Sequence, residues 1–320
     1  MSGRRHTAAS LAEEARAFDV QMRERLAAGH VPDLRRCGRC EWFDNNPWRD
    51  EAFVDLTYGE RFRFVAARLA PASRVLEAGC GPGFLSLELS RAGHDVTGVD
   101  VSPVAIDAAR ETAASSPPVP GAGALRYEVA DFLDLADGGY DAVVFSSSLH
   151  HFANQDRVAA HVERLLATNG AVCVMEPCRE RLDRAGAAVW LLAESLLSAA
   201  GAFWRDVPPC REREELDAAL DAYLRRGRWL GERGERVQSP HDMEAGMEDM
   251  LSALGARFAQ EAFEWEYAFF GNVIGGMRLG DRRREAALAR HMALVDACLV
   301  ELGALPAVGF RWFGRKGGGA

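Results

Sequence analysis

The chain lacks the excess of positive charge that is common in proteins that bind nucleic acids. Its 320 residues include 38 lysines and arginines against 47 aspartates and glutamates, so the formal net charge is −9 and the pI is near 5.5. A nucleic-acid backbone is usually bound through a basic stripe of lysines and arginines. The composition therefore disfavours a nucleic-acid partner.

The sequence also lacks a leader-like apolar run and an unbroken apolar stretch of membrane-spanning length. Residues 1–6 carry charge with no apolar segment behind them, so no secretory signal is predicted. The most apolar helical pattern, residues 186–204, approaches the length of a span, but Glu194, Ser195 and Ser198 share one of its faces. A carboxylate facing lipid is costly. We expect a cytoplasmic protein with no membrane partner, in which this segment is a buried lid helix or the contact of a homodimer.

Signals for metals and disulfides are weak. The seven cysteines are odd in number and scattered, which is typical of reduced, partly buried thiols. Cys37 and Cys40 form a C-x-x-C pair, but no second pair or H-x-x-x-H follows at zinc-finger spacing, and the pair precedes any βαβ unit. Two cysteines in a loop are the simpler interpretation, and no metal is predicted.

The most informative stretch that the sequence does contain is residues 74–100. An apolar strand at residues 74–77 leads into the glycine-rich turn GCGPG at 79–83, then a helical pattern at 84–92 and a second strand at 95–99 that ends on Asp100. Glycines let the backbone pass close to a ligand. An acid about 20 residues on can accept both hydroxyls of a ribose. The pattern predicts a site for a ribose-containing ligand.

Details of the turn indicate which ligand that is. The dinucleotide fingerprint G-x-G-x-x-G needs a third glycine where Phe84 stands, and the chain has no P-loop run. Phe84 and Pro82 suit a ligand with no phosphates to cradle. The run E-x-G-x-G-x-G from Glu77 to Gly83, followed by an acidic second strand, resembles the class I S-adenosylmethionine-dependent methyltransferases.

The resemblance implies a fold class of α/β type, with a doubly wound, mostly parallel seven-stranded sheet (the Rossmann-like methyltransferase fold) that ends in an antiparallel pair. Near-continuous apolar runs alternating with amphipathic helices agree with a parallel sheet covered on both faces. Further strands are expected at residues 124–130, 140–146, 171–175 and 309–314, with one or two within 258–274.

We expect four parts along the chain. A helical cap (1–70) has helices at 11–27 and 51–69; the cofactor-binding core (71–177) has a helix at 156–167. A helical lid insertion after the fifth strand (178–238) has helices at 186–204 and 211–228. The C-terminal part of the core sheet (239–320) has a helix that Ser239 caps and that runs to about 254, and another at 281–302.

The resemblance also implies S-adenosylmethionine as cofactor and S-adenosylhomocysteine as product. Asp131 would meet the exocyclic amine of adenine, and the backbone N–H of Phe132 a ring nitrogen. Tyr58 and Arg61 are either near the methionine carboxylate or ordinary surface groups, and Trp42, Phe43 and Trp48 either line a substrate pocket or attach the cap to the core. The predicted cofactor-binding set is Tyr58, Arg61, Glu77, Gly79, Cys80, Gly81, Gly83, Asp100, Val101, Asp131, Phe132, Ser146 and Ser147.

Three residues are candidates for catalysis. His150 and His151 follow the strand at 140–146, where the acceptor should meet the methyl group. In such a pair one histidine usually packs against the sheet, and we expect His150 to face the pocket as a general base or polar clamp. Glu176, at the end of the neighbouring strand, is the next candidate.

These features predict an enzyme that methylates O, N or C of a small metabolite, in natural-product biosynthesis. No N-P-P-Y or D-P-P-Y follows the strand at 140–146, which disfavours methylation of a DNA base amine or a glutamine amide, and the proline-cysteine pair of RNA cytosine enzymes is missing there. A peptide or protein acceptor is one alternative. A catalytically silent cofactor-binding scaffold is the other.

Overall fold

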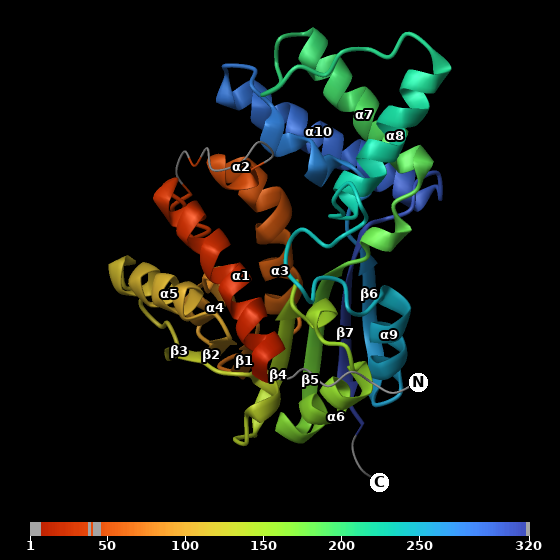
Figure 1. Ribbon diagram of the computed structural model, residues 1–320. Helices are drawn as coiled ribbons and strands as arrows, with labels where there is room; N and C mark the ends of the chain where they lie inside the picture. The colour runs from red at the N-terminus through yellow and green to blue at the C-terminus, as the bar shows by residue number, and fades with distance from the viewer. Residues whose placement is uncertain (1–7, 38–39, 41–45, 318–320) are drawn as a thin grey trace.

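The computed structural model describes residues 8–37, 40 and 46–317, and its centre is a single seven-stranded sheet (Figure 1). The order of the strands is β3-β2-β1-β4-β5-β7-β6, and β7 runs antiparallel to both of its neighbours. The strands are β1 (Arg74–Ala78), β2 (Asp95–Asp100), β3 (Leu125–Val129), β4 (Tyr140–Ser146), β5 (Leu166–Pro177), β6 (Phe258–Trp265) and β7 (Gly309–Lys316). The predicted fold class is confirmed.

Helices cover both faces of this sheet and extend beyond one end of it. They are α1 (Ala8–Ala27), α2 (Glu51–Val54), α3 (Glu60–Ala66), α4 (Phe84–Arg91), α5 (Pro103–Ser115), α6 (Gln155–Leu165), α7 (Arg184–Ala199), α8 (Arg213–Gly227), α9 (Met247–Gly255) and α10 (Arg282–Glu301). Between α2 and α3 the chain forms a π-helical turn, Asp55–Gly59. Sequence periodicity treats 51–69 as one regular helix and does not reveal that turn.

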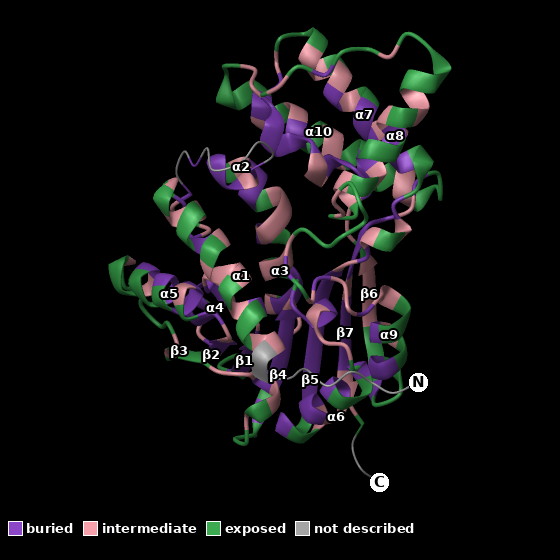
Figure 2. Cartoon of the chain, in the orientation of Figure 1, coloured by how far each residue is buried: buried purple, intermediate pink, exposed green. Residues whose placement is uncertain are grey.

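Alternating side chains of the central strands fill two cores. Leu76 of β1 packs with residues of α6 and α9, whereas its neighbour Val75 packs with α3 and α4 on the opposite face. Figure 2 shows the middle strands buried along most of their length. The sheet order reverses between β1 and β4, and ligands of open α/β sheets bind at the carboxyl ends of the strands beside such a reversal.

A third core lies beyond the sheet and joins elements that are far apart in sequence. It brings together α2, α7, α8 and α10 around Phe53, Trp190, Tyr223 and Ala289, and Figure 1 shows α7, α8 and α10 together at the top. The helix α10 therefore lies with the lid insertion, while α9, β6 and β7 lie with the sheet. We call α2, α7, α8 and α10 together the helical cap, which differs from the N-terminal cap predicted at residues 1–70.

One buried carboxylate holds the helical cap together. Glu194 of α7 has no exposed surface; it accepts hydrogen bonds from Trp190 Nε1 at 2.8 Å and Tyr223 Oη at 2.5 Å. The guanidinium groups of Arg205 and Arg226 lie 2.6 and 3.1 Å from its oxygens. The charged member of the polar face seen in the sequence, Glu194, is thus turned inward, against α8.

Several predicted boundaries are wrong for local reasons. The helix at 186–204 ends at Ala199, because Gly201 has a φ of +65° and its N–H bonds back to Ser198. The strand predicted to start at 171 starts at Leu166, directly after α6.

Two elements predicted after residue 238 also differ. Gly246, not Ser239, caps α9, and Ser239 donates to Glu14. No second strand follows β6 within 258–274, because Asp296 of α10 accepts the N–H groups of residues 268–270.

The outer side of α7 exposes apolar side chains. Leu192 and Leu196 are 58% and 63% exposed, and a homodimer through this helix stays a prediction. Among the described helices, none combines the length and the hydropathy needed to cross a bilayer.

Candidate functional site

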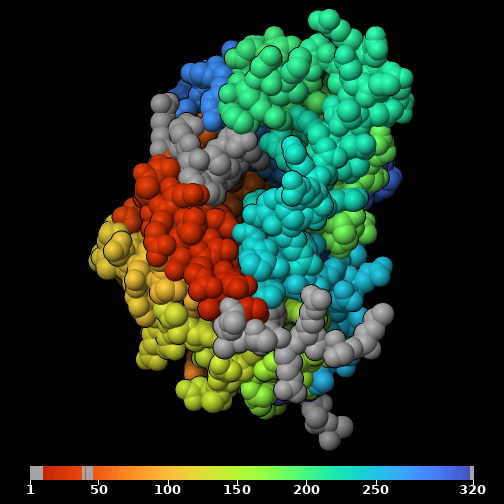
Figure 3. Space-filling model, viewed as in Figure 1, coloured from red at the N-terminus to blue at the C-terminus, as the bar shows by residue number. Residues whose placement is uncertain are grey.

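A cavity of about 1380 Å³ lies between the carboxyl ends of the strands, α1 and the helical cap. Figure 3 shows the surface hollowed between α1, in red, and the cyan residues that follow α8. All predicted cofactor-binding residues except Gly83 line this cavity, together with His151. Gly83, His150 and Glu176 do not. Trp48 lines it as well, whereas Trp42 and Phe43 lie outside the described residues.

The glycine turn and Asp100 form one hydrogen-bonded unit on the wall of the cavity. Asp100 accepts the N–H of Gly81 and the N–H of Ser102, both at 2.8 Å, through different carboxylate oxygens. Gly81 has a φ of +51°, and a Cβ built there would meet no atom within 4 Å. The turn therefore presents bare backbone to open space next to a fixed carboxylate.

The two flanking glycines are needed for packing. A Cβ on Gly79 would lie 2.5 Å from the Cβ of Ser148, and one on Gly83 would lie 2.6 Å from the ring of Tyr127. The Tyr127 hydroxyl donates to the carbonyl of Gly83 at 2.7 Å, which fixes the start of α4 from behind the cavity. Gly83 is thus a structural residue, which corrects its predicted place among the cofactor contacts.

Phe84, which stands where a dinucleotide site has its third glycine, packs against the N-terminal helices. Its ring lies 5.5 Å from Trp48 and 5.0 Å from Tyr58, both edge-on, and Trp48 and Tyr58 are 4.8 Å apart. Aromatic pairs in such arrangements add stability beyond the area that they bury. Trp48 therefore does both things considered from the sequence, since it lines the cavity and attaches the N-terminal part to the core.

Arg61 is held by an acidic partner inside the cavity. Its guanidinium forms two hydrogen bonds of 3.1 Å with Glu266 and donates to the hydroxyl of Ser147 at 2.6 Å. Ser147 itself has a φ of +57°, a conformation that non-glycine residues adopt at a cost. Arg61 is thus part of an ion pair at the end of β4, and a contact with the methionine carboxylate stays a prediction.

Asp131 and Phe132 follow β3 and line another part of the cavity wall. One oxygen of Asp131 accepts the N–H of Leu133 at 2.9 Å, so the carboxylate caps a short 3₁₀ turn. The Phe132 ring is buried edge-on against Phe145. Both residues line the cavity, and their contacts with adenine stay a prediction.

Glu77 is buried beneath the turn, where it is 1% exposed and pairs with the hydroxyl of Ser86. Burial raises the pKa of Glu77 to about 8 from its ordinary 4.5; the Ser86 hydrogen bonds oppose this rise and the nearby Asp100 charge adds to it. A raised carboxyl pKa stabilises the fold at low pH, and that contribution is lost as the pH rises from about 4.5 through about 8.

We therefore expect Glu77→Gln to flatten this pH dependence. The wild-type free energy of unfolding should fall by a few kcal/mol, as an order of magnitude, relative to the variant between about pH 5 and about pH 9. Denaturant unfolding at several pH values measures this. Glu128→Gln, an exposed change on β3, is the control. Equal slopes for wild type and Glu77→Gln would contradict the assignment.

The turn that follows β4 corrects the predicted roles of the histidines. His150 is 1% exposed and does not reach the cavity; its Nδ1 lies 2.5 Å from Glu176 Oε2 and its Nε2 lies 3.4 Å from Asp242 Oδ1. Burial disfavours the charged ring, but Glu176 and Asp242 outweigh it and raise the pKa of His150. The 3₁₀ turn Leu149–His151 sends the first histidine inward and the second toward the cavity.

Glu176 positions this turn from inside the protein. It has no exposed surface, and its Oε1 accepts the N–H groups of Ser148 and Leu149 at 2.8 Å each. The Ser148 hydroxyl in turn donates to the carbonyl of Ala78 at 2.6 Å. The histidine turn and the glycine turn are thus joined directly, and the predicted direct catalytic role of Glu176 is wrong, because the carboxylate is sealed off from the cavity.

His151 lines the cavity next to a carboxylate that the sequence did not suggest. Its Nδ1 lies 2.8 Å from Glu14 Oε1 of α1, and Phe18 of the same helix packs edge-on against its ring. Burial and the neighbouring His150 lower the pKa of His151. Glu14 is fixed by the Ser239 hydroxyl and the His241 N–H at 2.7 and 3.0 Å. No local motif marks Glu14, because its partners His151, Ser239 and His241 are all more than 130 residues away in the sequence.

The part of the cavity beneath the helical cap is aromatic. Its walls include Trp190, Trp229, Trp265, Tyr267 and Phe270. Trp229 has a φ of +55° and is 40% exposed, and the guanidinium of Arg179 lies 4.8 Å from the centre of its ring. A bulky residue in this backbone conformation is uncommon and is found mostly where the surrounding structure enforces it. This part of the cavity therefore suits an apolar ligand.

Comparisons with known proteins agree with this geometry. A family model described as a methyltransferase domain matches residues 75–170. Residues 75–170 form a class I, S-adenosylmethionine-dependent methyltransferase domain. The predicted recognition is confirmed, and the matched range holds the glycine turn, Asp100, Asp131 and both histidines.

Curated relatives of this methyltransferase domain match only in part. The magnesium-protoporphyrin O-methyltransferase of Rhodobacter capsulatus is 40% identical over 83 residues, which cover 26% of this chain and 35% of that protein. The ubiquinone biosynthesis O-methyltransferase of Xanthomonas axonopodis pv. citri is 34% identical over 114 residues, which cover 34% and 46%. The chain spans less than half the length of these curated relatives.

Solved structures share the fold over the whole chain. A geranyl diphosphate C-methyltransferase from Streptomyces coelicolor A3(2) has a TM-score of 0.52 at 12% identity and covers 98% of this chain and 100% of that one. The [4+2]-cyclase SpnF also has a TM-score of 0.52, at 19% identity and complete coverage of both chains. Proteins with different reactions in their names therefore share the fold of this methyltransferase domain, and the reaction has to be argued from the site.

Proposed function

We propose that the chain is an S-adenosylmethionine-dependent methyltransferase that acts on O, N or C of a small metabolite in natural-product biosynthesis. This proposal rests on one observation: a single cavity is lined by two sets of residues with different chemistry. The turn at Gly79–Gly81, Asp100 and Asp131 line one half, and the aromatic walls of the helical cap line the other.

The residues present fit S-adenosylmethionine. Each oxygen of Asp100 accepts one backbone N–H, which leaves each oxygen a further lone pair for a ribose hydroxyl. The open space over Gly81 leaves room for the ligand beside bare backbone. We propose that Asp100 holds the ribose, Asp131 and the N–H of Phe132 hold the adenine, and Tyr58 and Arg61 lie near the methionine end.

When bound, S-adenosylmethionine would supply an electrophilic methyl group. The sulfonium sulfur that carries this methyl group is a good leaving group. The protein then has to orient the acceptor and keep water out. The turn that carries His151 is fixed against the glycine turn through Ser148 and Glu176, so the acceptor half has a fixed position relative to the cofactor half. The helical cap covers that half.

The size of the cavity supports a small but bulky acceptor. Pockets for single drug-sized ligands are roughly 300–1,000 Å³, and about 1380 Å³ exceeds this range. The cofactor and a ring-containing acceptor therefore fit together. Relatives whose names include magnesium-protoporphyrin and ubiquinone favour a metabolite over a peptide.

Transfer from methyl-labelled S-adenosylmethionine tests the proposal. The protein is incubated with the labelled cofactor and a metabolite extract that has been separated from peptides, and we expect label in that small-molecule fraction. Label in the peptide fraction alone would favour a peptide methyltransferase. Tight binding of S-adenosylhomocysteine with no transfer to any fraction would favour the cofactor-binding scaffold.

A further inference from the structure

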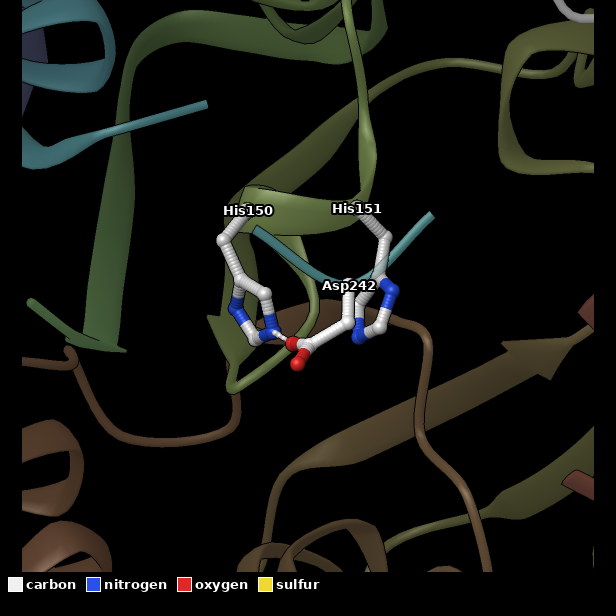
Figure 4. A group of neighbouring side chains, drawn as sticks. All are labelled: His150, His151 and Asp242. Atoms are coloured by element: carbon white, nitrogen blue, oxygen red, sulfur yellow. Dashed lines mark ion pairs between the residues drawn. The ribbon is translucent and has the colours of Figure 1, made fainter. Parts of the chain in front are cut away.

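Three side chains beside the cavity form a cluster that has no role in the proposed methyl transfer. One nitrogen from each of His150 and His151 and a carboxylate oxygen of Asp242 all lie within 4.8 Å of one another. Figure 4 shows Asp242 between the two rings, with the His150 ring turned toward its carboxylate. The two histidines come from the turn after β4, and Asp242 comes from the segment before α9.

The ring nitrogens in this cluster lack ordinary hydrogen bonds. Among the described residues, Nε2 of His150 and both ring nitrogens of His151 are buried and make no hydrogen bond of ordinary geometry, although Nδ1 of His151 lies 2.8 Å from Glu14 as an ion pair. The 3.4 Å between His150 Nε2 and Asp242 Oδ1 exceeds a normal N–H···O distance. Buried polar atoms without a partner are rare in folded proteins, and a bound ion is one of the few explanations.

The surroundings match the outer shell of a metal site. Histidine ligands of metals usually present their second nitrogen to a carboxylate, which fixes the ring orientation. Both histidines do so here, since Nδ1 of His150 lies 2.5 Å from Glu176 and Nδ1 of His151 lies 2.8 Å from Glu14. In each case Nε2 is the nitrogen left available.

The excess of negative charge around the cluster also favours a bound cation. Glu14, Glu176 and Asp242 are all at least 95% buried, and the guanidinium of Arg179, 2.8 Å from Asp242, is the one arginine paired with them in the described part of the chain. The carboxylates favour a protonated His150, which compensates one of these charges; with both histidines in the neutral form that binds a metal, the cluster has two negative charges in excess. Buried charges are costly unless they are compensated, and a divalent ion would balance these two.

We propose that His150, His151 and Asp242 bind a divalent transition metal ion such as Zn²⁺. Two imidazoles and one carboxylate are a common ligand set for zinc and leave one position open in a tetrahedral site. With bonds of about 2.1 Å, ligand atoms in such a site lie about 3.4 Å apart. The His150–Asp242 separation already has this value, and the ion would draw His151 inward by about an ångström.

The site lies at the acceptor half of the cavity, because His151 and Arg179 both line it. The fourth position would take an oxygen of the acceptor, and a metal ion promotes loss of the proton from such an oxygen. This role at the acceptor rests on the proposed function. The metal site itself does not, because it is argued from the buried cluster alone.

Zinc binding to the whole protein tests the site without cofactor or acceptor. Protein treated with a chelator is titrated with Zn²⁺ in competition with a chromophoric chelator, and we expect one equivalent to bind. His150→Ala and Asp242→Asn should each weaken binding at least about 100-fold. Glu14→Gln, which removes only an outer-shell charge, should weaken it about 10–100-fold. His161→Gln, a buried histidine of α6 outside the cluster, is the control and should bind as wild type does.

The buried pair Cys37 and Cys40 is the competing place for zinc. Co²⁺ substituted into a site of nitrogen and oxygen ligands lacks the intense thiolate charge-transfer band that cysteine ligands produce, and we expect no such band. A doubly substituted Cys37→Ser, Cys40→Ser protein should still bind one equivalent.

Three results would overturn the metal site. They are no bound equivalent, binding that His150→Ala, Asp242→Asn and Glu14→Gln leave unchanged, and binding that the cysteine substitutions abolish. Calorimetry with S-adenosylhomocysteine on the same preparations separates this outcome from a failure of the proposed function, since each ligand is measured alone.

Discussion

Asp100→Ala is expected to bind S-adenosylhomocysteine at least ten times more weakly than the wild-type protein. The change removes the carboxylate proposed to accept both ribose hydroxyls. Hydrogen bonds to charged groups contribute about 1.5–3 kcal/mol each, and about 1.4 kcal/mol corresponds to a factor of ten. Losing two of them therefore predicts a tenfold loss even after water compensates in part. Isothermal calorimetry measures the change.

The control for this experiment lies on the same strand. Asp95, at the other end of β2, accepts the N–H of Ala124 at 2.8 Å but does not line the cavity. Asp95→Ala loses a similar backbone contact, so it reports what damage to the strand alone costs. If Asp100→Ala and Asp95→Ala bind S-adenosylhomocysteine equally well, the ribose does not lie at the end of β2.

Glu194→Ala is expected to lower the free energy of unfolding by about 3 kcal/mol. The substitution leaves Arg205 and Arg226 without their carboxylate and Trp190 and Tyr223 without their acceptor. Removing one partner of a buried ion pair costs about 3–5 kcal/mol. We expect the lower end, because the two arginines are about one-third exposed and water can solvate them. Denaturant unfolding measures the loss.

A surface ion pair between the same two helices provides the comparison. Asp221 of α8 lies 2.7 Å from Arg184 of α7, and both side chains are about half exposed. Exposed pairs contribute about 0–1 kcal/mol, so Asp221→Ala should leave stability nearly unchanged. Losses of equal size in the two variants would mean that the burial of Glu194 does not stabilise the helical cap.

The geometry of the proposed cofactor half could be predicted from the sequence because its determinants are local. The glycine turn, the strand behind it and Asp100 lie within 27 consecutive residues, and backbone conformation alone brings them together. Phe84 marked the turn as unlike a dinucleotide site in the sequence, and in the structure its ring packs edge-on against Tyr58.

The acceptor half could not be predicted in the same way because tertiary contacts decide it. Which histidine faces the cavity depends on a single 3₁₀ turn and on Glu176, which draws His150 inward. Glu14 and Asp242 come from segments that meet only in the folded protein, through the bond from Ser239 to Glu14. No spacing rule connects residues so far apart.

The π-helical turn Asp55–Gly59 sets the rotational phase of everything that follows it in the helix. Each residue advances an α-helix by about 100°, and a π-turn accommodates one residue more than an α-helical turn does. If the same residues were wound as regular α-helix with none removed, the residues that follow would be rotated by about one residue's advance, roughly 100°, and Arg61 would turn away from Ser147 and Glu266. A homologue with one residue fewer at this point would therefore form a regular α-helix and still place its counterpart of Arg61 at the end of β4, whereas an α-helical turn of the same length would not.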